Sequence, residues 1–118
     1  MKKYLPLLLV FLLAFAGCQS GPATYEKAKT PEEVVSHSEK FTNQVAKKSK
    51  HYTTEDWEAA VEQFVMMGKN YMEVHNYLTT EQQMRYDNAR MKFMGAVDAT
   101  GDEELALRVK EEYSKVLY

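Results

Sequence analysis

The chain has 118 residues, of which 15 are basic and 17 acidic, so that its net charge is −2. This length provides one domain with a modest core. The balanced charge argues against nucleic acid as a partner, since binding to phosphates requires an excess of Lys and Arg. Cys18 is the only cysteine, which excludes an internal disulfide.

The first residues have the pattern of an export signal. Lys2 and Lys3 give a positive start, and an apolar run over 5–16 follows, interrupted only by Pro6. A segment that crosses a bilayer needs roughly 20 apolar residues, so this run is too short to span one. It has the length of the apolar core of a signal peptide.

The end of this run, Phe15-Ala16-Gly17-Cys18, resembles the lipobox of bacterial lipoproteins, although leucine is commoner where Phe15 stands. The resemblance implies that residues 1–17 are a signal peptide that is removed, and that Cys18 carries a diacylglycerol through a thioether. The alternative is an ordinary secretory signal, cleaved after Ala16, that leaves Cys18 as a free thiol.

The residues after Cys18 predict where the protein resides. Gln19 stands where aspartate would retain an enteric lipoprotein at the inner membrane, so we expect the outer membrane. No acidic run follows Cys18, which favours the periplasmic side over the cell surface. Without residues 1–17 the chain has 13 basic and 17 acidic side chains, which gives no broad basic face for membrane binding.

Residues 18–29 are predicted to be a flexible tether, and residues 30–118 a helical domain. Ser20, Gly21 and Pro22 interrupt the tether, which has no apolar period. Its 11 residues after Cys18 would span at most about 36–40 Å when extended.

Four helix starts in the domain share one pattern, a polar cap followed by acidic or amide residues. They are Thr30-Pro31-Glu32-Glu33, Thr53-Thr54-Glu55-Asp56, Thr80-Glu81-Gln82-Gln83 and, after Gly101, Asp102-Glu103-Glu104. The predicted helices are 31–50, 54–78, 80–99 and 102–117, and Lys47, Lys48 and Lys50 favour the end of the first.

The fold class predicted is all-α, a small antiparallel bundle of three to four helices. The second helix has an apolar seam with helical spacing, formed by Trp57, Val61, Phe64, Gly68, Tyr71, His75 and Leu78. Short connections favour an up-down arrangement, and a fourth helix packed across three others is the alternative.

The third helix has more apolar surface than one seam requires. Met84 and Met91 lie opposite the side of Tyr86 and Phe93, with Met94 in between. We expect this helix to be central, with the methionines in contact with a second neighbour. The alternative is that Met84, Met91 and Met94 form a face for a partner.

Two resemblances bear on function. Tyr52 to Trp57, with Leu78 to Gln82, resembles small Gram-negative lipoproteins that carry a helical domain of unknown function, with Y-T-x-E-D-W and L-T-x-E-x landmarks. The second landmark also resembles the L-T-x-x-Q motif of periplasmic stress chaperones, which form cradle-shaped dimers. Helix capping alone also produces that motif.

Candidate catalytic residues are few, and we expect neither an enzyme nor a cofactor. A Met/His site for copper or haem, at His75 with Met72, is the alternative to a core histidine. The sequence thus predicts a lipid-anchored protein that binds an unknown envelope protein or other envelope component through a helical domain. A membrane-tethered chaperone is the second hypothesis, and the bundle closes either alone or as a homodimer.

Overall fold

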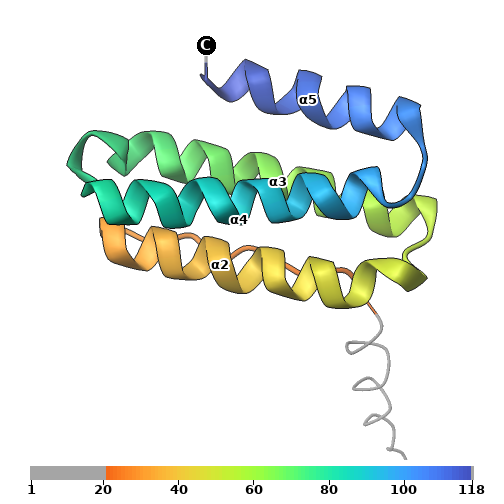
Figure 1. Cartoon of the computed structure of the whole chain (residues 1–118), viewed down its shortest axis with the longest axis horizontal. Helices are drawn as coiled ribbons and strands as arrows, with labels where there is room; N and C mark the ends of the chain where they lie inside the picture. Colours follow the sequence, from red (N-terminus) through yellow and green to blue (C-terminus); the bar gives the residue numbers. More distant parts are fainter. Residues whose placement is uncertain (1–20, 118) are drawn as a thin grey trace, which may run out of the picture.

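The structure, a computed structural model, describes residues 21–117, so Cys18 and the predicted signal peptide lie outside the described residues. The described part has four long helices and no strand (Figure 1). They are α2 (Pro31–Lys48), α3 (Thr54–Val74), α4 (Thr80–Asp98) and α5 (Glu103–Leu117). The predicted all-α bundle is confirmed.

Each helix begins at a capping residue that the sequence supplies. The Thr53 hydroxyl accepts from Asp56 N at 3.1 Å, while the Asp56 carboxylate accepts from Thr53 N at 3.0 Å. Thr79 and Gln82 form the same reciprocal pair at the start of α4, so the cap is Thr79. Such pairs satisfy backbone N–H groups that have no partner within the helix.

Two helices end earlier than predicted. After Lys48 the chain tightens into a 3₁₀ turn, η1 (Ser49–His51), and after Val74 into a second one, η2 (His75–Tyr77). Tight turns of this kind are common at helix ends. The predicted helices 31–50 and 54–78 were too long because they counted residues of these turns as α-helix.

Consecutive helices run antiparallel, which places the first and third, α2 and α4, side by side in the same direction (Figure 1). Arg85 of α4 binds Glu32 of α2 at 3.1 Å and Glu39 at 2.7 Å. Farther along both helices, Lys92 donates to Asn43 at 2.6 Å. These pairs fix the register between the two helices on the bundle surface.

The core is built around Phe93 of α4. Its ring stacks on Phe64 of α3 with 4.0 Å between the ring centroids, and it also contacts Phe41 of α2 and Trp57 of α3. Tyr113 of α5 stacks on the other side of Phe64 at 4.6 Å. Stacked and edge-on aromatic pairs of this kind add to the stability gained by burial.

Gly68 of α3 lies under the Tyr113 ring, where a side chain has no room. A Cβ atom at this position would lie 2.7 Å from Tyr113 Cε1. The ring is held in place because the Tyr113 hydroxyl is hydrogen-bonded to that of Tyr86 at 2.6 Å. Gly68 therefore sets how closely α5 approaches α3.

We predict that Gly68→Ala lowers the free energy of unfolding by about 1 kcal/mol or more, because the overpacking cost exceeds the gain in helix propensity. Gly95→Ala is the matched control, since Gly95 is also helical but its added Cβ meets no atom within 4 Å. The control should raise stability by up to about 1 kcal/mol. Urea unfolding followed by circular dichroism measures both, and a Gly68→Ala protein as stable as the native chain would contradict the close contact.

Candidate functional site

The segment before the first helix packs onto the bundle as an extended strap, which we define as residues 21–29. Ala23, Tyr25 and Ala28 are 3%, 5% and 8% exposed, while Thr24 and Glu26 face outward. Figure 1 shows this segment, in orange, running behind α2. The predicted flexible tether over 18–29 is therefore wrong for the strap, because its apolar side chains are buried in the core.

The Asn70 side chain of α3 makes four hydrogen bonds, three of them to the strap. Its Oδ1 accepts from the Tyr25 hydroxyl at 2.7 Å and from Ala28 N at 2.8 Å. Its Nδ2 donates to Ala28 O and to Glu73 Oε1, both at 2.9 Å. The carboxamide is only 1% exposed, and all of its donors and acceptors are satisfied. Asn70 thus ties two points of the strap to one buried group.

Further hydrogen bonds hold the rest of the strap. Tyr25 N donates to Gln63 Oε1 at 2.7 Å, and the His37 Nδ1–H donates to the Glu26 carbonyl at 2.8 Å. At the start of the strap, Ala23 N donates to the Tyr52 hydroxyl at 3.0 Å. The strap is therefore bonded to α2, α3 and the η1–α3 connection.

Burial also keeps the strap tyrosine in its hydrogen-bonding form. It raises the pKa of Tyr25 to about 12, and it raises the pKa of Tyr52 as well. The Tyr25 hydroxyl thus stays protonated into the alkaline range, where it still donates to Asn70. A carboxamide has the acceptor oxygen that can bind this hydroxyl and Ala28 N, and the donor nitrogen that can bind Ala28 O.

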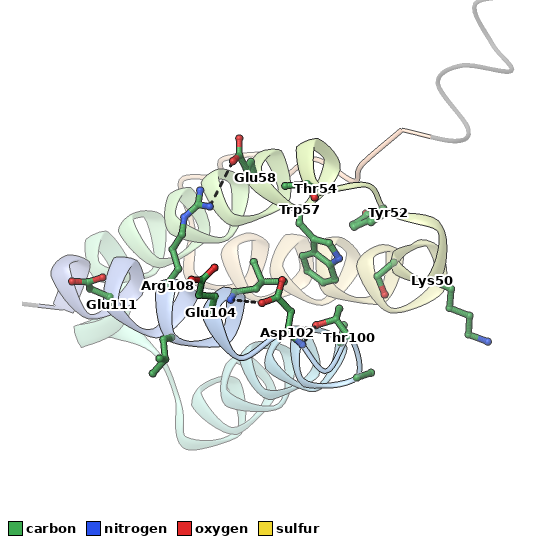
Figure 2. A pocket seen from close by; sticks show the side chains of 15 residues that line it. Lys50, Tyr52, Thr54, Trp57, Glu58, Thr100, Asp102, Glu104, Arg108 and Glu111 are labelled. Carbon is green, nitrogen blue, oxygen red and sulfur yellow. Dashed lines mark hydrogen bonds and ion pairs between the residues drawn. The ribbon is translucent and has the colours of Figure 1, made fainter.

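An open groove of about 900 Å³ lies at the end of the bundle where the strap begins (Figure 2). The Trp57 indole lies across its floor (Figure 2), and Leu105 of α5 also lines it. An ion pair of 3.7 Å between Glu58 and Arg108 joins α3 to α5 along one side. The groove mixes an apolar floor with charged walls, which suits an amphipathic ligand better than a purely apolar one.

The polar groups of this groove mainly serve the fold. The Asp102 carboxylate accepts from Leu105 N and caps α5, and the Thr100 hydroxyl donates to the Val97 carbonyl. No nucleophile lies within hydrogen-bonding distance of a base among the groups that line it.

The structure places His75 away from the seam where the sequence put it. His75 is the first residue of η2, is half-buried, and lies beside the Tyr71 ring with 5.7 Å between centroids. The buried positions of α3 shift to Met67, Asn70 and Val74 because the strap covers that side. Within residues 21–117 no group of three or more His, Cys, Asp or Glu side chains could hold a metal ion.

We expected the methionines of α4 to contact a second neighbouring helix, but two of them do not. Met84 and Met91 are 60% and 61% exposed, because the neighbours of α4 cover its other sides. Met94 is half-buried and packs against the core, so it does not share the outer face. Met72, the other methionine considered as a metal ligand, is half-buried on α3.

The sequence analysis missed the residues that build the strap contact. Tyr25 and Ala23 stand two positions apart with polar neighbours, which is the pattern of an extended segment with one buried side. This alternating pattern was present in the sequence, but the neighbouring Gly21 and Pro22 favoured the prediction of an irregular segment. Asn70 gave no signal, since a polar residue on a helix usually faces water.

Comparisons with models of protein families, with curated protein sequences and with solved structures found no match to this chain. None of the helices in residues 21–117 combines the length and apolar composition needed to cross a bilayer.

We predict that Asn70→Ala lowers the free energy of unfolding by about 2–4 kcal/mol, since the Tyr25 hydroxyl and Ala28 N–H lose their partner in a buried place. The matched control is Asn88→Ala, at an exposed position of α4, which should change stability by less than about 0.5 kcal/mol. Both are measured by urea unfolding. Equal stabilities for the two variants would mean that the strap is not held by Asn70.

Proposed function

We propose that this chain is a lipid-anchored protein of the bacterial envelope, whose helical domain binds another envelope protein or component without catalysing a reaction. The lipid is carried by Cys18 after removal of residues 1–17. The outer membrane, on its periplasmic side, is the proposed location.

The observation that carries this proposal is the strap, because it joins the lipidation signal directly to the folded domain. Ala23, which is hydrogen-bonded to Tyr52, follows Cys18 by only five residues. A lipid on Cys18 would thus hold the whole bundle at the membrane by a fixed point. Such an arrangement suits a protein whose task is to present a surface at a defined place.

The outer face of α4 is the proposed partner-binding surface. Met84 and Met91 lie two turns apart on it, with Asn88 between them, and all three are exposed. Exposed methionines adapt their shape to a partner at little cost. The chaperone hypothesis requires a broad apolar concavity, and a client-aggregation assay with the purified domain distinguishes it from this one.

Intact mass spectrometry of the protein from bacterial membranes tests the anchor. We expect a chain that begins at Cys18 with the added mass of a diacylglycerol, and a Cys18→Ser variant that is neither lipidated nor retained by membranes. A mature chain that begins at Gly17, with an unmodified thiol, would show ordinary secretion and refute the anchor.

Cross-linking in cells tests the α4 face. A photoreactive side chain at position 88 should capture an envelope component, and Met84→Gln with Met91→Gln should reduce this capture by about tenfold or more, since the contact loses its apolar anchors. The matched control is Met66→Gln, because Met66 is 42% exposed on α3. Equal capture by all variants would contradict a methionine-based surface.

A further inference from the structure

Three lysines form a basic edge at the end of α2, which we define as Lys47, Lys48 and Lys50. Lys47 and Lys50 are exposed and Lys48 is half-buried. No ion pair joins any of them to another described residue, whereas Lys27, Arg85, Arg108 and Lys115 are paired. Figure 2 shows Lys50 pointing away from the groove. These charges are therefore available to a partner.

The strap begins beside this edge. Tyr52, which binds the backbone of Ala23, follows Lys50 by two residues. Figure 1 shows the first described residues close to the end of α2. The point where the chain leaves the bundle toward Cys18 thus lies beside these three lysines.

The chain between Cys18 and the bundle is short. Ala23 follows Cys18 by five positions, and a fully extended chain of that length spans at most about 17–18 Å. A lysine side chain adds several ångströms of reach toward the same surface. If Cys18 is lipidated, as proposed above, the basic edge lies within reach of the lipid headgroups.

We propose that the basic edge binds the anionic phospholipid headgroups of the bilayer that holds the Cys18 lipid. Each lysine near an anionic surface adds attraction, and a lipid chain combined with a basic cluster is a recurrent way of fixing a protein on a membrane. The turn between α4 and α5 at the same end of the bundle is acidic, with Asp98, Asp102, Glu103 and Glu104. Its repulsion from an anionic bilayer turns that side outward.

This contact fixes the orientation of the domain as well as its position. The 18 residues of α2 span about 27 Å, and α4 runs parallel to α2. Met84, near the start of α4, therefore lies at the end of the bundle away from the lipid. The proposed partner surface then faces the periplasm.

The test attaches the lipid chemically, so that it does not depend on lipidation in cells. Cys18 is the only cysteine, so a phospholipid-maleimide couples to residues 18–118 at that position alone. The coupled protein is placed on phosphatidylcholine vesicles with or without about 30% phosphatidylglycerol. Lysine acetylation, read by mass spectrometry, then reports which amines the surface covers. Lys69, Lys92 and Lys110, exposed on three other helices, are internal controls.

We expect the basic edge to react at least about threefold more slowly on anionic than on neutral vesicles, and the control lysines to change little. High salt should remove the protection. In a variant with the three edge lysines changed to Gln, the remaining lysines should be acetylated at the same rate on both vesicles. In a variant with the three control lysines changed to Gln, the edge lysines should still be acetylated more slowly on the anionic vesicles. The proposal would be overturned if the edge lysines reacted equally on the two kinds of vesicle. It would also be overturned if these lysines were protected in cell envelopes but not on vesicles. Neither result bears on whether cells lipidate Cys18.

Discussion

The buried carboxamide of Asn70 determines how the N-terminal segment relates to the bundle. It is removed from water and uses all four of its hydrogen bonds, two of them with the backbone of Ala28 and one with the Tyr25 hydroxyl. A buried polar group is costly unless it is satisfied, so the strap must be in place for Asn70 to be stable where it lies. The position of the strap at Tyr25 and Ala28 follows from this one constraint.

A docked strap changes what a lipid on Cys18 would do. A flexible tether of 11 residues would let the domain move freely over tens of ångströms. Docking at Ala23 leaves a much shorter connection, so the membrane that held this lipid would meet one particular end of the bundle. The basic edge of α2 and the outward methionines of α4 would then have a defined relation to the bilayer, because the helices between them are rigid.

The helices could be predicted from sequence because their determinants are local. Threonine caps, acidic first turns and apolar spacing act within a few residues, and Thr53 with Asp56 forms the expected capping pair. The strap could not be predicted in the same way, since Asn70 lies 42 residues from Ala28. The exposure of Met84 and Met91 also depends on which sides of α4 its neighbours cover, and spacing along one helix does not contain that information.

Hydrogen exchange of the strap amides tests the central claim most directly. In the domain without its lipid, NMR should show the Tyr25 and Ala28 amides exchanging at least about a thousandfold more slowly than in an unstructured peptide, because Ala28 N donates to the buried Asn70 and Tyr25 N to the half-buried Gln63. In Asn70→Ala this protection should disappear while the α3 and α4 amides stay protected. Exchange of Tyr25 and Ala28 at the rate of a free peptide in the native chain would contradict a docked strap.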